Sequence, residues 1–291
     1  MCGIIYAKNL TGNESVNNLI KMLYQNQKSR GQQGFGFVGM NSKSIDTYRA
    51  INEKEILGHL NAKPYSELLF HHRYPTSTRN TIKSTHPFVV RLNRKKYYFV
   101  HNGIVQNDTE LQECHIKRKI TYNSQEEGLF NDSEALAWDF CLWLNGKQAK
   151  MQAKGTMAFI CLETDEKNKA LKLYFYRNAE VPLKVYRDDV LLVVSSEGNY
   201  PSLKENCLCC WDYESRNVLK VAELKIDCPP LYDVYMDDED FDDDILYAEL
   251  QELRHERDYL ISVGSYDEAD YIQEQITDLS YQIKGRTLTP F

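Results

Sequence analysis

The chain has 291 residues, enough for one large domain with an appendage, and its apolar fraction of 42% and charged fraction of 26% are ordinary for a globular protein. No apolar run approaches the roughly 18 residues of a membrane span, and the N-terminus lacks the basic and apolar regions of a signal peptide, so we expect a cytoplasmic protein without a membrane partner. The net charge of −7 equals that of the seven acidic residues in DDEDFDDD at 237–244, which leaves the remainder near neutral. Nothing in the sequence resembles a basic surface for phosphate backbones, so we expect no nucleic-acid binding by this chain alone.

The first predicted element is a strand, GIIYA at 3–7, and a cysteine stands between it and the initiator methionine. Cysteine is small enough for the methionine to be removed, which would place the thiol and the α-amine of Cys2 on one residue. The same residue can also be interpreted as a small buried hydrophobe that opens a strand.

Further strands are predicted along the chain because short segments rich in β-branched and aromatic residues recur between turn residues. These segments are FGFVGM at 35–40, ELLFHHR at 67–73, KYYFVHN at 96–102, MAFICLE at 157–163, LKLYFYR at 171–177 and VLLVVSS at 190–196. Two helices are predicted between them, at 15–31 with Ser15 as N-cap and Gly31 as its end, and at 132–144. We therefore expect residues 1–228 to form one α/β domain.

The eight cysteines, in a chain of this size without a signal peptide, indicate free thiols in a reducing compartment. Three of them lie in CLCC at 207–210, which has no second ligand pair at zinc-like spacing and whose alternation also suits a strand. We expect no metal.

The C-terminal segment changes in pattern after Pro229 and Pro230. We expect an acidic linker at 229–244, an antiparallel helical hairpin at 245–284 and a tail at 285–291. Gly264 is placed to end the first helix, and Ser265 with Glu268 has the spacing of a capping box for the second. About 40 residues are near the size at which a core cannot sustain itself, and the spacing loosely resembles a short hairpin that mediates protein contacts in nucleotide-excision-repair proteins, so the hairpin is interpreted as a docking element.

Polar motifs interrupt the strands in a definite order. They are Cys2-Gly3-Ile4, Arg30-Gly31, His71-His72-Arg73-Tyr74-Pro75-Thr76, His101-Asn102-Gly103 and Asn131-Asp132-Ser133-Glu134. In this order and spacing, over roughly residues 2–200, they resemble the motifs of class II glutamine amidotransferases, which are N-terminal-nucleophile (Ntn) enzymes. The resemblance implies an α+β fold, the Ntn-hydrolase four-layer αββα sandwich, here followed by the helical hairpin, and a reaction that releases ammonia from L-glutamine without any cofactor.

The resemblance also implies a role for each motif residue. Cys2 would be the nucleophile, and Asn102 with Gly103 would form the oxyanion hole. Arg73 would bind the α-carboxylate of glutamine and Asp132 its α-ammonium group. The remaining three would support the site: Arg30 braces the nucleophile, while Thr76 and Gly31 shape the pocket.

The residue types fit this chemistry independently of the family. A thiolate is the attacking form of cysteine, and an α-amine with a pKa of about 7.7–8.0 on the same residue can accept the thiol proton. No histidine base is then required, so we interpret His71, His72, His86 and His101 as neutral, structural residues.

The sequence departs from the family at three places. Arg30-Gly31-Gln32-Gln33 stands where many members have Arg-Gly-x-Asp, and Glu180-Val181-Pro182-Leu183 replaces a Ser-Pro-Leu segment. Only about 90 residues follow position 200, and they show no acceptor site, so we expect a glutaminase domain that passes ammonia to a separate synthase protein docked through the hairpin.

Two alternatives remain open at this point. The same nucleophile could hydrolyse γ-glutamyl amides in small-metabolite synthesis, or the domain could be a catalytically silent binding scaffold. The preserved polar residues Cys2, Arg73, Asn102, Gly103 and Asp132 argue against the scaffold.

Overall fold

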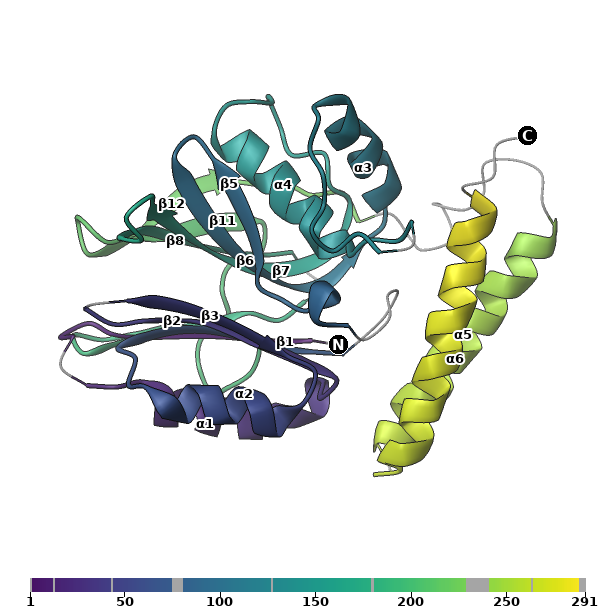
Figure 1. The fold of residues 1–291 in the computed structure, drawn as a ribbon, viewed down its shortest axis with the longest axis horizontal. Coiled ribbons are helices and arrows are strands. Elements are labelled where there is room, and N and C mark those ends of the chain that lie inside the picture. The colour runs from purple at the N-terminus through teal and green to yellow at the C-terminus, as the bar shows by residue number, and fades with distance from the viewer. Residues whose placement is uncertain are drawn as a thin grey trace.

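The computed structural model describes residues 2–12, 14–42, 44–74, 81–126, 128–178, 181–228, 241–262 and 264–287. Two six-stranded antiparallel sheets face each other, and helices cover their outer faces (Figure 1). A pair of long helices lies beside this sandwich. The predicted four-layer α+β sandwich is therefore confirmed.

The first sheet has the strand order β3-β2-β4-β1-β10-β9. Its strands are β1 (Gly3–Asn9), β2 (Gly34–Met40), β3 (Ile45–Ala50), β4 (Glu67–Arg73), β9 (Lys184–Arg187) and β10 (Leu191–Ser195). In the register of the central pair, Gly3 of β1 lies opposite His72 of β4. This pairing places the residue before β1 next to the residue after β4.

The second sheet has the order β12-β11-β8-β7-β6-β5. Its strands are β5 (Phe88–Leu92), β6 (Lys95–Val105), β7 (Gly155–Asp165), β8 (Ala170–Arg177), β11 (Cys207–Asp212) and β12 (Asn217–Glu223). The CLCC segment lies in β11, in agreement with the strand interpretation of its alternation.

The outer layers consist of two helices on each sheet. The helices α1 (Asn17–Asn26) and α2 (Glu53–Ala62) cover the first sheet, and α3 (Asp108–Lys117) and α4 (Asp132–Leu144) cover the second (Figure 1). Short 3₁₀ turns occupy Lys28–Arg30 and Ile82–Ser84.

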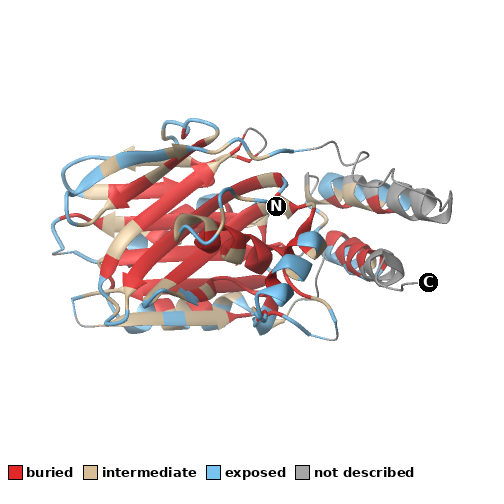
Figure 2. Ribbon diagram, turned by 90° about the horizontal axis from the view of Figure 1, so that it is seen from above, coloured by how far each residue is buried: buried red, intermediate tan, exposed pale blue. Residues whose placement is uncertain are grey.

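The central strands are buried on both faces, which explains their nearly continuous apolar sequences. In β1, Ile4 and Tyr6 pack between the two sheets, whereas Ile5 and Ala7 pack under the helices of the first sheet. Figure 2 shows the same concentration of buried residues on the central strands. Such strands lack polar alternation because neither face meets water.

The helix predicted at 15–31 is shorter than expected, and Ser15 is not its N-cap. Helix α1 begins at Asn17, with Val16 as the capping residue, and the Ser15 hydroxyl instead accepts a hydrogen bond from the backbone N–H of Asn17. The helix ends at Asn26, and the following 3₁₀ turn redirects the chain. This turn carries Arg30 toward the start of β1.

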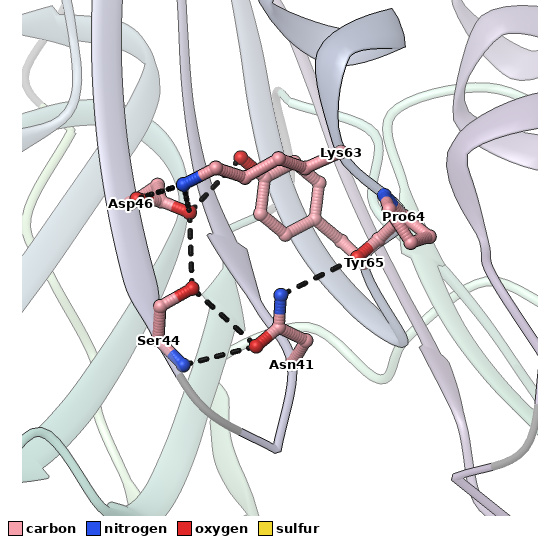
Figure 3. A network of polar contacts seen from close by, with 6 residues as sticks. All are labelled: Asn41, Ser44, Asp46, Lys63, Pro64 and Tyr65. Carbon is pink, nitrogen blue, oxygen red and sulfur yellow. Dashed lines mark hydrogen bonds and ion pairs between the residues drawn. The ribbon is translucent and has the colours of Figure 1, made fainter.

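A polar network fixes the far end of the first sheet, at the turn between β2 and β3 (Figure 3). Asp46 accepts hydrogen bonds from Lys63, from the Tyr65 hydroxyl and from Ser44. Burial of Asp46 opposes ionisation, but these donors outweigh it and lower the pKa of the carboxyl below its ordinary value. The network ties β3 to the segment that enters β4.

The C-terminal helices are α5 (Phe241–Ser262) and α6 (Tyr266–Thr287), with Gly264 between them at φ +84°. They pack on each other through a small apolar cluster of Leu250, Ile272, Ile276 and Leu279. The last four residues of the expected linker, 241–244, and the first three of the expected tail, 285–287, lie in these helices, while 229–240 lie outside the described residues.

Candidate active site

Cys2 lies at the head of β1, beside the end of β4. Its sulfur accepts a hydrogen bond from the backbone N–H of Tyr74 at 3.4 Å and lies 3.6 Å from the carbonyl oxygen of the same residue. The side chain is half-buried. The antiparallel register of β1 and β4 produces this contact, because it brings the residue before Gly3 to the residues that follow His72.

Arg30 and Gly31 lie against the same strand ends. The Arg30 side chain donates to the carbonyl oxygen of Cys2 at 3.1 Å and forms an ion pair with Glu197. A Cβ atom on Gly31 would lie 2.4 Å from the backbone of Arg73, so only glycine fits between the two segments.

Arg73, the last residue of β4, is buried, with 3% of its surface exposed. Its guanidinium donates to the Ser84 hydroxyl at 2.9 Å. The carbonyl oxygen of Ser84 in turn accepts from the Asn131 side chain at 3.1 Å. Ser84 thus links Arg73 of the first sheet to the start of α4, which covers the second.

Asn102 and Gly103 lie in β6 on the second sheet. Asn102 is 1% exposed, and neither its side-chain nitrogen nor its oxygen has a hydrogen-bond partner among the described residues. Gly103 has φ +139°, and a Cβ there would lie 2.0 Å from the Thr156 carbonyl oxygen. A buried amide without partners carries a desolvation cost of about 1–3 kcal/mol, which is typical of a group kept for a ligand or a reaction intermediate.

The two sheets meet at these residues. The Nε2 atom of His71 in β4 donates to the carbonyl oxygen of His101, the residue before Asn102, at 3.2 Å. His71 lies opposite Ile4 of β1 in the register. The pairing of β1 with β4 and this hydrogen bond therefore connect the strand that follows Cys2 to His101, the residue before Asn102.

Asp132 is the first residue of α4 and is buried. One of its carboxylate oxygens accepts from the backbone N–H of Val105 at 2.9 Å, and the other accepts from the Ser133 hydroxyl at 3.3 Å. The carboxylate thus lies at the N-terminus of α4 and accepts two hydrogen bonds. The carboxylate retains lone pairs for a cationic group.

Four buried histidines surround the strand ends. Burial lowers the pKa of His71, His86 and His101, and it lowers that of His72 to about 3. The proton of the neutral His72 ring lies on Nδ1, which donates to the Gly31 carbonyl oxygen at 2.8 Å. These rings stay neutral at pH 7, in agreement with their interpretation as structural residues.

This burial predicts a loss of stability in mild acid. The pKa of His72 is about 3 in the folded protein and about 6.5 in the unfolded chain, so the unfolded chain binds an extra proton between these values. We expect His72 to reduce the free energy of unfolding by about 2 kcal/mol as the pH falls from 7 to 5. Urea unfolding at both pH values should show that His72→Asn weakens this dependence by that amount. An unchanged dependence would contradict the burial argument.

Some residues at the site were not predicted as contributors from the sequence. Tyr74 stood inside a quoted motif without a role, whereas Ser84 and Glu197 had no local signal. Thr76, one of the predicted pocket residues, lies outside the described residues. Within the described ranges, no cluster of three or more His, Cys, Asp or Glu side chains could hold a metal ion, and no helix is long and apolar enough to cross a membrane.

Comparison with known proteins gave a relative of known activity. Over 161 residues, the chain is 30% identical to the isomerizing glutamine–fructose-6-phosphate aminotransferase of Methanosarcina acetivorans. This match covers 53% of the chain and 24% of the relative. No protein-family model matches the chain.

Solved structures share the fold. The allosteric regulatory enzyme of purine biosynthesis superposes with a TM-score of 0.61 at 18% identity, over 77% of this chain and 50% of that one. The glutamine phosphoribosylpyrophosphate amidotransferase from B. subtilis, in complex with ADP and GMP, superposes with a TM-score of 0.55 at 16% identity, over 75% and 49%. The chain thus spans about a quarter of the curated relative and about half of each solved structure.

Proposed function

Because the chain carries a domain of the class II glutamine amidotransferase type, we propose that it hydrolyses the side-chain amide of L-glutamine through a thioester on Cys2. The proposal requires Cys2 to become the N-terminal residue, so that its α-amine can take the thiol proton. The thiolate attacks the amide carbon, and the tetrahedral intermediate collapses with release of ammonia, which takes that proton. Water then cleaves the thioester to give glutamate and the free thiol.

The observation that carries the proposal is the buried, unpartnered amide of Asn102 beside Gly103. An oxyanion hole needs donors that are already oriented and desolvated before negative charge develops. The side-chain N–H groups of Asn102 have this character, because no described residue accepts a hydrogen bond from them. The oxyanion of the tetrahedral intermediate would be their acceptor.

The zwitterionic end of glutamine matches the two buried charges of the site. Arg73 would pair with the α-carboxylate while Ser84 holds its guanidinium in place. Asp132 would accept from the α-ammonium group through the lone pairs left free by Val105 and Ser133. The link from Ser84 to Asn131, the neighbour of Asp132, sets the spacing between these charges.

The fate of the ammonia is part of the same proposal. A synthase protein that docks through α5 and α6 would receive it, in a reducing compartment such as the cytoplasm where Cys2 stays a free thiol. The names of the relatives include fructose-6-phosphate and phosphoribosylpyrophosphate, and no described residue of this chain selects between such acceptors.

Substrate comparison tests the proposal against the γ-glutamyl amide alternative. We expect ammonia release from glutamine to have a kcat/KM at least about tenfold above that for amine release from γ-glutamylmethylamide, because a site that binds the unsubstituted amide must also accommodate the extra methyl on the leaving nitrogen. Glutamate formation from both substrates can be followed in one coupled assay. A higher kcat/KM for the methylamide would favour the alternative, and no turnover of either substrate by protein that lacks Met1 would favour the scaffold.

A further inference from the structure

The hairpin of α5 and α6 lies against the nucleophile end of the sandwich (Figure 1). The Gln33 side chain donates to Asp270 of α6 at 2.7 Å, and the guanidinium of Arg257 in α5 lies 4.7 Å from the centroid of the Tyr74 ring. A cavity of about 670 Å³ separates the two surfaces, with Gln32, Gln33 and Tyr74 on one wall and Ile261, Tyr266 and Asp270 on the other. The hairpin therefore contacts the segments that follow Gly31 and Arg73.

Arg257 is held rigidly in this position. It is only 7% exposed, although it carries a charge. Its guanidinium donates to Gln273 of α6 at 3.0 Å and to the neighbouring Asp258 at 2.6 and 2.9 Å. These hydrogen bonds fix the plane of the guanidinium, so that its face can pack on the Tyr74 ring. Such a cation–π contact stabilises by about 0.5–2 kcal/mol, and by more when it is desolvated.

Tyr74 connects this contact to the nucleophile. Its backbone N–H donates to the sulfur of Cys2, and it directly follows Arg73. Its hydroxyl has no hydrogen-bond partner among the described residues, so packing of the ring, not a bond of the hydroxyl, holds the residue. The N–H lies in the peptide between Arg73 and Tyr74, whose carbonyl oxygen accepts from the backbone N–H of Gln33 at 3.2 Å. The hairpin therefore reaches this peptide from two sides, through Asp270 on the Gln33 side chain and through Arg257 on the Tyr74 ring.

From these contacts, and on the basis of the proposed function, we infer that Arg257 is a positioning residue of the glutaminase reaction. It packs on the ring of Tyr74, and the Tyr74 N–H then orients the sulfur of Cys2. An N–H that donates to sulfur favours the thiolate over the thiol. The packing of the hairpin against Tyr74 thus controls the reactivity of the Cys2 thiol, in addition to any role of the hairpin in docking a partner.

The test uses the full chain and three variants. Arg257→Gln removes the positive charge and keeps a polar side chain, whereas Arg257→Lys keeps a cation near the ring. Glu256→Gln removes the adjacent exposed charge and serves as the matched control. The rate of Cys2 alkylation by iodoacetamide is measured against pH by mass spectrometry of the N-terminal peptide, which separates Cys2 from the other seven cysteines, and kcat and KM for glutamine are measured on the same samples. Circular dichroism verifies that the helices are retained.

We expect Arg257→Gln to lower kcat about tenfold with little change in KM, and to move the midpoint of the alkylation profile to higher pH. Arg257→Lys should recover most of both effects, and Glu256→Gln should match the wild type. If Arg257→Gln does not fold, Tyr74→Leu, which removes the ring and keeps the N–H, must show the same upward shift.

Unchanged alkylation and kcat in the folded Arg257→Gln variant, or in Tyr74→Leu, would overturn the inference. The proposed function fails separately, if the wild type does not turn over glutamine. In that case an alkylation shift in Arg257→Gln would still support control of Cys2 by the hairpin.

Discussion

Cys2→Ala is expected to lower glutamine hydrolysis by at least about 10⁴-fold, because no other group in the proposed mechanism can form the thioester. Alanine is as acceptable as cysteine for removal of the methionine, so the variant changes the thiol and leaves the N-terminal α-amine in place. The half-buried thiol makes few contacts, so the free energy of unfolding should change little. Glutamate release by the purified variant is the measurement.

Cys114→Ala is the matched control for this experiment. Cys114 is an exposed cysteine on α3, which covers the second sheet and contributes no proposed site residue. Its replacement should leave glutamate release unchanged. Residual activity of Cys2→Ala within tenfold of the wild type would rule out Cys2 as the nucleophile.

Asn102→Leu is expected to lower the rate of glutamine hydrolysis without lowering the stability of the fold. Loss of one oxyanion donor lowers kcat by about 10²–10³-fold, while KM changes little because the oxyanion forms only after glutamine has bound. Leucine has a similar volume, and the amide it replaces makes no hydrogen bond with a described residue. The free energy of unfolding, measured in urea, should therefore stay the same or rise.

Asn178→Leu, at the residue that follows β8 of the same sheet, provides the opposite case. Asn178 is also buried, but its side-chain oxygen accepts from the Met157 N–H at 3.0 Å and its nitrogen donates to the Gly155 carbonyl at 2.7 Å. Its replacement leaves both backbone groups without a hydrogen-bond partner and should lower the free energy of unfolding by about 1–3 kcal/mol for each group. If Asn102→Leu destabilised the fold as much and kept its kcat, Asn102 would be a structural residue.

The layers of the fold could be predicted from the sequence wherever a strand is buried on both faces. Strands β1 and β7 are largely apolar in sequence because each face packs on a different layer. The strand β12 was not predicted, because most of its residues are exposed and its sequence, NVLKVAE, carries two charges. The helix α3 was missed for the same reason, since only three of its ten residues are buried.

The sequence motifs name the residues of the candidate site, but the contacts that support these residues could not be predicted. Cys2, Arg30, Gly31 and Arg73 lie together because two strand ends and one turn meet. Glu197, which pairs with Arg30, lies 167 residues away along the chain, and such a pair follows from topology alone. The contact between the hairpin and Tyr74 could not be predicted from local sequence either, because Arg257 looks like an ordinary charged residue on the surface of a helix.

Intact mass before and after reaction with 6-diazo-5-oxo-L-norleucine decides whether Cys2 acts as an N-terminal nucleophile. We expect a mass lower than that of the full sequence by one methionine, and a single adduct that is absent from Cys2→Ala and present in Cys114→Ala. A retained methionine without an adduct, in protein produced where methionine removal operates, would show that Cys2 is not an N-terminal nucleophile and would favour the binding scaffold.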